Sequence, residues 1–285
     1  MAVRLTAGWS WSWFPFSKMT NSLFILYRPG FESRAGLLSD TLGLQCFAIT
    51  ASASMSGMGL VVDEAGLALQ QLGPKAPGPV RCDFSSGAAR HRRLYGGGKG
   101  QDIAKAIGLS HKGFKPRVLD LTAGLGRDGF VLASLGAQVT MVERHPIVFA
   151  LLTDGLSRAR ESAEYEADGE LLGILDRIHA VHSESSEFLE NLTADQSPDV
   201  IYLDPMFPPR DKSGKVKKEM QLFHQLVGMG AEDSDRLLSL SLQQANYRVV
   251  VKRPAHAPFL NGREPGYSLK GKSTRFDIYP LKKLP

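Results

Sequence analysis

The sequence predicts an α/β fold with an open, mainly parallel sheet, preceded by a small α+β subdomain. In the segment Val118–Phe130, an apolar run ends in Asp120, passes through a glycine-containing turn and continues as an apolar helix. Two further apolar runs end in acids, Glu143 and Asp204. A strand, a glycine turn and a helix followed by an acid-tipped strand are typical of a sheet that binds a nucleoside at its carboxyl edge. We therefore expect a Rossmann-like sheet.

Size and composition restrict the class of protein. The chain has 285 residues, 43% of them hydrophobic and 22% charged, as in an ordinary globular protein with a sizeable core. Its net charge of +5 fits a polyanionic partner without requiring one. Cys46 and Cys82 have no metal-ligand spacing, so we expect no metal, no disulfide framework and a reducing cytoplasm. No apolar run reaches the roughly 18 residues of a membrane span.

The N-terminal part is expected to hold an extension and a small subdomain. Residues 1–18 carry aromatic side chains interrupted by Ser and Pro, which is unlike a signal peptide, and we interpret them as a dispensable extension. Residues 19–88 mix short apolar runs with a Pro/Gly loop and are interpreted as the α+β subdomain, with residues 89–285 as the main domain. The expected strands are Ser22–Tyr27, Gln45–Thr50, Gly59–Asp63 and Val80–Phe84, and the expected helical pieces are Arg34–Leu42 and Leu67–Leu72.

A basic, glycine-rich segment, Ala89–Gly100, precedes an expected helix at Gln101–Ile107. Free N–H groups and the helix dipole favour anions at such a helix start. The segment is not a Walker P-loop, because no Ser or Thr follows Lys99. It is either a flexible basic linker or a contact to phosphate or to a cofactor carboxylate. We favour the contact and assign Arg92, Arg93 and Lys99 to RNA binding.

The glycine loop leaves two cofactors open. Gly124, Gly126 and Gly129 match G-x-G-x-x-G, and Glu143 lies near the ribose-acid offset of about 20 residues, so a nicotinamide or flavin enzyme is a formal candidate. Two features argue against it. The motif begins deep in the chain, and Asp120 would repel a pyrophosphate. S-adenosylmethionine carries an ammonium group for Asp120, a ribose diol for Glu143 and no phosphate, so we favour it.

The next elements continue an alternating order of helices and strands. A strand at Ile178–His182 is followed by Glu184 and Ser185, whose side chains could hydrogen-bond an adenine edge at the strand's tip. The remaining expected helices are Pro146–Ala159, Met220–Met229 and Asp235–Ala245, and the last expected strands, which would form an antiparallel pair, are Tyr247–Lys252 and Arg275–Tyr279.

A buried strand at Val200–Leu203 brings Asp204 to the same edge as Asp120. The prolines that follow stiffen the chain, and the segment is either a rigid turn or a loop that presents the Pro205 carbonyl and the Phe207 ring to a planar substrate. We favour the second interpretation. The basic run beyond it is expected to contact nucleic-acid phosphate through Arg210, Lys212, Lys217 and Lys218.

Several strings resemble the ribosomal small-subunit methyltransferase J family. This resemblance implies a seven-stranded class I methyltransferase sheet and S-adenosylmethionine-dependent methylation of the exocyclic N2 amine of a guanosine in 16S rRNA, with that RNA or the small subunit as partner. A nicotinamide oxidoreductase, a non-catalytic rRNA-binding protein and a DNA amino-methyltransferase remain alternatives. The strings that carry the resemblance are His91–Gly98, Asp120–Asp128, Glu143 with Arg144, Tyr202–Pro208, Val216–Met220, Val249–Pro254 and Arg275–Tyr279.

The resemblance also implies site residues. Asp204 and the Pro205 carbonyl would accept the amine hydrogens of the base, and Phe207 would stack on it. Two positions depart from the family pattern: Glu184 stands where the family more usually has a serine, and Met206 replaces the second proline of the Asn/Asp-Pro-Pro-Tyr/Phe motif of related amino-methyltransferases. The implied cofactor contacts are Arg127, Asp128, Glu143, Arg144, Glu184, Ser185 and Asp204.

Overall fold

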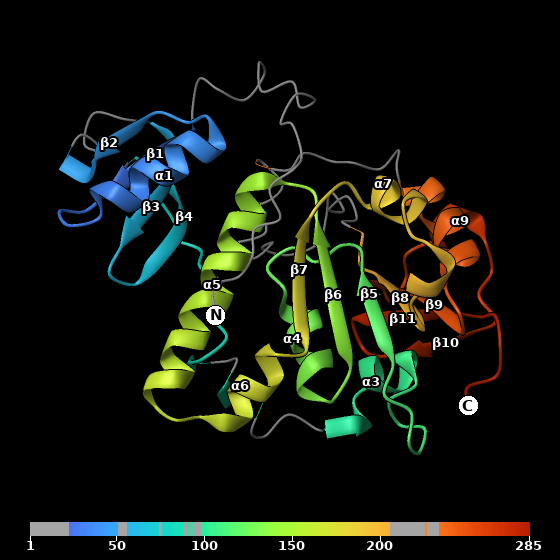
Figure 1. Cartoon of the computed structure of the whole chain (residues 1–285). Coiled ribbons are helices and arrows are strands. Elements are labelled where there is room, and N and C mark those ends of the chain that lie inside the picture. Colours follow the sequence, from blue (N-terminus) through green and yellow to red (C-terminus); the bar gives the residue numbers. More distant parts are fainter. Residues whose placement is uncertain are drawn as a thin grey trace. The chain divides into compact units, whose positions relative to one another are not determined.

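The computed structural model describes residues 23–50, 56–73, 76–87, 90–91, 93, 98–205, 226 and 234–285. The chain divides into two compact units (Figure 1), one made of residues 1–63 and 69–78 and the other of residues 64–68 and 79–285. Residues 1–18, expected to be an extension, lie outside the described residues, as does the expected helix at Met220–Met229 except for Leu226, which is helical.

The smaller unit is organised by a four-stranded sheet of order β2-β1-β3-β4. Strand β1 pairs in parallel with both β2 and β3, and its Ile25 and Leu26 are fully buried. Helix α1 has a left-handed Gly43 at its C-cap, as helix ends commonly do. The elements are β1 (Leu23–Tyr27), α1 (Glu32–Leu42), β2 (Cys46–Ala48), β3 (Gly57–Asp63) and β4 (Gly66–Leu72).

Two local predictions in this region are wrong. The leucine-rich piece Leu67–Leu72 belongs to strand β4 rather than to a helix, because the chain turns back at residues 64–65 and joins the sheet beside β3. Pairing with a neighbouring strand outweighs the helix propensity of leucine. The expected strand Val80–Phe84 forms only an isolated bridge at Val80, although its alternate apolar side chains are buried.

The larger unit is built on a seven-stranded sheet of order β10-β11-β9-β8-β5-β6-β7. Strands β7, β6, β5, β8 and β9 are parallel, whereas β11 runs antiparallel to β9 and to β10. The expected seven-stranded sheet is confirmed, with β10 as a strand that the pattern did not predict. The strands are β5 (Arg117–Asp120), β6 (Gln138–Glu143), β7 (Ile178–His182), β8 (Val200–Leu203), β9 (Arg248–Pro254), β10 (Tyr267–Lys270) and β11 (Thr274–Pro280).

Helices cover both faces of this sheet (Figure 1), with α4, α5 and α6 packed together on one face and α7 against α9 on the other. Leu119 and Ile201 belong to the core that α7 and α9 cover. Met141 of β6 points to the other face of the sheet and packs against Gly129 of α4. Helix α5 runs beyond its expected end at Ala159. The helices are α3 (Asp102–Ile107), α4 (Arg127–Ser134), α5 (Pro146–Tyr165), α6 (Gly169–Leu175), α7 (Ser185–Glu190) and α9 (Ser234–Gln244).

The strand order reverses at β5, which pairs with β6 on one side and with β8 on the other. In open α/β sheets, ligands bind outside the carboxyl ends of the strands at this reversal. We therefore expect the ligand-binding residues at the carboxyl ends of β5, β6 and β8 and directly after them.

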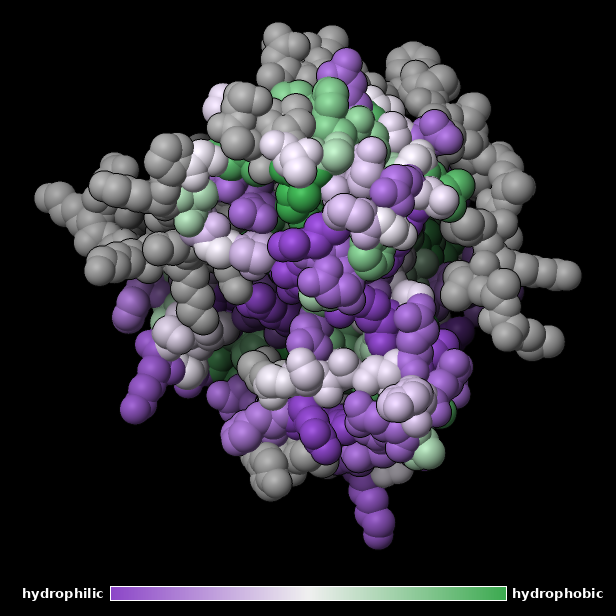
Figure 2. Space-filling view, turned by 90° about the vertical axis from the view of Figure 1, so that its left-hand side faces the viewer, coloured by the Kyte–Doolittle hydropathy of each residue, from purple (hydrophilic) through white to green (hydrophobic). Residues whose placement is uncertain are grey.

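Among the residues coloured by hydropathy in Figure 2, hydrophilic ones predominate, and hydrophobic ones gather in separate patches. Within the described ranges, no helix combines the length and the apolar character needed to cross a membrane.

Candidate active site

Three carboxylates and one lysine meet at the carboxyl edge of the sheet, where the strand order reverses. Lys252, near the end of β9, donates to Asp128 Oδ2 at 2.6 Å and to Asp204 Oδ2 at 2.8 Å. The hydroxyl of Tyr202, on β8, donates to the same Asp128 oxygen at 2.7 Å. One cation thus bridges the first turn of α4 and the residue that follows β8. It holds Asp204 by one carboxylate oxygen only.

Asp120, the third acid, is joined to this group through Thr122. The backbone N–H of Thr122 donates to Asp120 Oδ1 at 3.1 Å, and its hydroxyl oxygen accepts the N–H of Asp204 at 2.6 Å. Asp120 is 2% exposed and pairs in register with Tyr202 across β5 and β8. The structure therefore brings Asp120 and Asp204 together at one edge. Pro205 directly follows Asp204, within the described chain.

Burial and like charges alter the protonation of this cluster. Burial, reinforced by the nearby Asp128 and Asp204 carboxylates, raises the pKa of Asp120 to about 8. Burial also raises the pKa of Asp204, whereas the Lys252 ammonium acts in the opposite direction and favours its ionised form. The pKa of Lys252 is raised because the two carboxylates outweigh its desolvation. At neutral pH, Lys252 is therefore cationic.

Most backbone N–H groups of the glycine loop after β5 already donate to acceptors within the protein. Five of the six N–H groups of residues 121–126 bind acceptors on the loop itself or on strands β5, β6 and β8. Gly126 has φ +70°, and a Cβ there would lie 2.5 Å from the Leu152 side chain. At Gly124, the nearest atom of the described residues to a Cβ would be the Thr122 carbonyl oxygen, 3.9 Å away. Gly126 thus serves packing, whereas the described residues leave room for a ligand beside Gly124.

Glu143 lies at the tip of β6 and is 8% exposed. Its two oxygens accept backbone N–H groups, one from Gly124 at 2.8 Å and the other from His145 at 2.7 Å. These bonds fix the carboxylate beside Gly124. The following residue, Arg144, accepts a hydrogen bond at its carbonyl from His182 Nε2 when that nitrogen carries the proton, at 3.1 Å.

Glu184 and Ser185 lie at the start of α7, after β7. The Glu184 side chain caps the helix by accepting the N–H groups of Ser186 and Glu187, at 2.6 and 3.1 Å. The Ser185 hydroxyl is buried and donates to the Leu121 carbonyl at 2.6 Å, which ties α7 to the glycine loop. Both residues are at the expected strand tip, and both make structural bonds there.

The residues expected to contact RNA are only partly described. Arg93 forms an ion pair with Asp168 at 2.7 Å and its side chain is 5% exposed, whereas Lys99 is exposed in the short 3₁₀ helix Gly98–Gly100. Arg127 and Asp128 open helix α4, where Asp128 joins the lysine bridge described above. The expected site residues that lie outside the described chain are Arg92, Phe207, Arg210, Lys212, Lys217 and Lys218.

Three members of the cluster were not assigned to the site from the sequence: Thr122, Tyr202 and Lys252. Each stands in or just after a strand, at its carboxyl end, which is the signal that could have identified them. Lys252 is the most informative, because it follows three valines in β9 and a charged residue there needs a partner.

The cluster fits S-adenosylmethionine better than a dinucleotide. Carboxylates at the ends of β5, β6 and β8 suit an ammonium group and a ribose diol, which are cationic or hydrogen-bond donors. A pyrophosphate would need free backbone N–H groups, and the loop has already used most of its own. Asp120, Asp128 and Glu143 are the residues that would hold the methyl donor.

Comparisons with known proteins agree with this geometry. A family model for SAM-dependent methyltransferases matches residues 44–281. Ribosomal RNA small subunit methyltransferase J of Cellvibrio japonicus is 59% identical over 226 residues, which are 79% of this chain and 84% of that protein. The protein of the same name from Stutzerimonas stutzeri is 52% identical over 256 residues, 90% of this chain and 94% of its own.

Among solved structures, a SAM-dependent methyltransferase from Neisseria gonorrhoeae matches with a TM-score of 0.66 and 37% identity, over 90% of this chain and 95% of that one. The sheet order, the acid-tipped strands and these relatives lead to one conclusion. The chain belongs to the ribosomal RNA small subunit methyltransferase J family of S-adenosylmethionine-dependent methyltransferases.

Proposed function

We propose that this chain methylates the exocyclic N2 amine of a guanosine in 16S rRNA, with S-adenosylmethionine as the methyl donor and the RNA or the small ribosomal subunit as partner. Support comes from the relatives' names, which specify small-subunit ribosomal RNA. It also comes from Asp204, whose position at the strand reversal suits an amine acceptor.

The second carboxylate oxygen of Asp204, Oδ1, carries the proposal. Lys252 holds Oδ2, and among the described residues Oδ1 accepts no hydrogen bond. A guanine amine is a poor nucleophile because its lone pair is delocalised into the ring. An ionised Asp204 Oδ1 and the Pro205 carbonyl would accept the two amine hydrogens, which draws the nitrogen toward tetrahedral geometry and orients its lone pair.

The remaining residues position the reactants. When bound, S-adenosylmethionine supplies an electrophilic methyl group on a sulfonium. Asp120 would accept from a cationic amine, Glu143 from a ribose diol, and Lys252 keeps Asp204 ionised and fixed. Orientation of this kind can contribute several kcal/mol to catalysis. Proton loss from the amine follows methyl transfer, so the site needs no strong general base.

The test is methyl transfer from labelled donor to small subunits and to naked 16S rRNA that lack the modification, followed by nucleoside mass spectrometry. We expect N2-methylguanosine with the wild-type chain and a loss of about 100-fold or more in kcat for Asp204→Asn. Asp176→Asn, an exposed acid paired with Arg160 on the surface, is the matched control and should behave as wild type. Wild-type turnover by Asp204→Asn, or another methylated nucleoside, would refute the proposal.

A further inference from the structure

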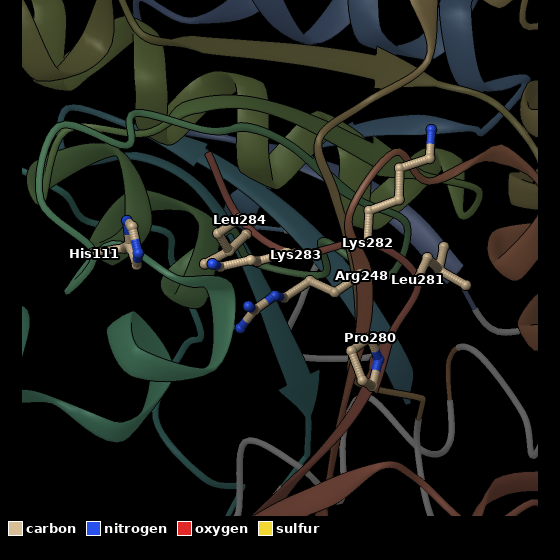
Figure 3. A pocket seen from close by; sticks show the side chains of 7 residues that line it. All are labelled: His111, Arg248, Pro280, Leu281, Lys282, Lys283 and Leu284. Carbon is tan, nitrogen blue, oxygen red and sulfur yellow. The ribbon is translucent and has the colours of Figure 1, made fainter.

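A pocket lies at the opposite edge of the same sheet, near the amino end of β9. It has a volume of about 460 Å³ and opens between the loop after α3 and the C-terminal tail. Its lining is basic, and in Figure 3 the side chains of Arg248 and Lys283 extend toward His111 while Lys282 points away from them. The lining residues are His111, Arg248, Pro280, Leu281, Lys282, Lys283 and Leu284.

Arg248 is the central residue of this pocket, at the start of β9. It is 8% exposed, and its Nη1 donates to the Ala106 carbonyl at 3.0 Å and to the Tyr267 hydroxyl at 3.2 Å. Its Nε is buried and has no acceptor among the described residues. Neither partner carries a negative charge. The guanidinium is therefore held in place through Nη1 by two neutral acceptors, and no carboxylate of the described residues pairs with it.

The wall of the pocket is assembled by the C-terminal tail. The N–H groups of Leu281 and Lys282 both donate to the Tyr247 carbonyl, at 2.7 and 3.1 Å. Leu284 packs over Gly108, where a Cβ would lie only 2.6 Å from its Cδ1. The tail is thus fixed against the loop that follows α3, and Lys283 is carried on an anchored segment.

Basic side chains predominate around the pocket. Segments 108–116 and 280–285, which form its two sides, contain four lysines and no acidic residue. A buried arginine without a carboxylate partner is unusual, because an uncompensated charge is costly to bury. An anion in the pocket would complete it, and the planar fork of arginine matches two oxygens of a phosphate group.

We propose that this pocket binds a backbone phosphate of the RNA substrate, held by Arg248 and Lys283. The inference rests on the proposed function for the identity of the ligand. Arg248 and Lys252 stand four residues apart on β9, which places the two edges roughly 13 Å apart along the strand. A phosphate contact at the far edge carries no base specificity, and it would fix the orientation of a large folded RNA relative to the methyl-transfer edge.

The test measures binding of the full-length chain to small ribosomal subunits without methyl donor, over a range of salt concentrations. Lys283→Gln removes one phosphate contact and should weaken binding several-fold, with a slope of log affinity against log salt that is smaller by about 0.7 to 0.9. Arg248→Gln should weaken binding to the subunit more than Lys283→Gln does, and Arg248→Lys should bind more tightly than Arg248→Gln. Arg160→Gln, at a surface arginine paired with Asp176 and outside the pocket lining, is the control and should bind as wild type.

The outcomes separate the two proposals. If Lys283→Gln and Arg248→Gln keep the wild-type salt slope, or if Arg160→Gln loses as much affinity as Lys283→Gln, the pocket assignment is overturned. Calorimetry with inorganic phosphate provides the other arm: binding of free phosphate without an effect of Lys283→Gln on subunit affinity would also overturn it. If the two variants show the expected slope changes but the wild-type chain transfers no methyl group, the proposed function is refuted and the pocket assignment is kept. Circular dichroism verifies that Arg248→Gln is folded.

Discussion

Strand β9 has Arg248 at its amino end and Lys252 near its carboxyl end, and these two cations have opposite environments. Lys252, at the carboxyl end, is bridged by the carboxylates of Asp128 and Asp204. Arg248, at the amino end, is held by a carbonyl and a hydroxyl, and its Nε has no acceptor among the described residues. At one edge of the sheet, carboxylates of the protein therefore neutralise the cation. At the other edge, its described partners are uncharged.

The difference indicates separate roles. A lysine that already has two carboxylate partners cannot serve as an anion site, and its effect is to fix and ionise the acid beside it. An arginine that is buried without an acid gains most from an anionic ligand. We therefore expect changes at Lys252 to alter the chemical step and changes at Arg248 to alter binding of the RNA.

The largest effect is expected for Lys252→Met. Without the ammonium, Asp128 and Asp204 repel each other, the pKa of Asp204 rises further and less of it is ionised at pH 7. We expect kcat at pH 7 to fall by about 100-fold, with partial recovery at higher pH. Lys252→Arg keeps the charge and should retain most of the rate. A pH–rate profile identical to that of wild type would contradict this role.

Asp120→Asn should reveal how much the buried acid lowers the unfolding free energy. Burial raises its pKa to about 8, so between pH 4 and 8 the folded state holds a proton that the unfolded state releases. This acid therefore lowers stability as the pH rises through that window. Asparagine has nearly the same shape without the charge, and the variant should exceed the wild type in unfolding free energy at pH 8.5 by at least about 1.4 kcal/mol.

The advantage of Asp120→Asn should vanish near pH 4, and its affinity for S-adenosylmethionine should fall because the donor's ammonium loses a carboxyl group that it would ionise on binding. Denaturant unfolding at several pH values and calorimetry with the donor measure the two effects. A stability difference that does not change with pH would show that Asp120 is ionised in the free protein.

Tyr202→Phe should have the smallest effect. It deletes one hydrogen bond to Asp128, which keeps its bond to Lys252. We expect a loss of about 0.5 to 1.5 kcal/mol in unfolding free energy and a change in kcat of a few-fold at most. Thermal unfolding and steady-state rates measure both. A loss in kcat comparable to that of Lys252→Met would show that the hydroxyl, rather than the ammonium, orders the cluster.

Much of the larger unit could be predicted from the sequence, because its strands are continuous apolar runs with a polar residue at the end. Asp120, Glu143 and Asp204 could be placed on one edge for that reason, since parallel strands deliver their carboxyl ends together. Strand β10 was missed because Tyr267–Lys270 is short and half exposed, and its pairing with β11 decides its conformation.

What the sequence could not provide were partners distant along the chain. The Lys252 bridge joins residues 124 and 48 positions away, and no local pattern encodes it. The Arg248 pocket depends on the C-terminal tail, which folds back onto the Tyr247 carbonyl and onto Gly108. Arg93 likewise looked like a surface cation until the fold placed it beside Asp168.

The most direct test of the separation between the two edges is steady-state methyl transfer to small subunits by two variants, Lys252→Met and Lys283→Gln, at saturating donor. We expect Lys252→Met to lower kcat with little change in KM for the subunit. We expect Lys283→Gln to raise KM several-fold with kcat close to wild type. If both substitutions change the same parameter to the same extent, the two ends of β9 do not have separate roles.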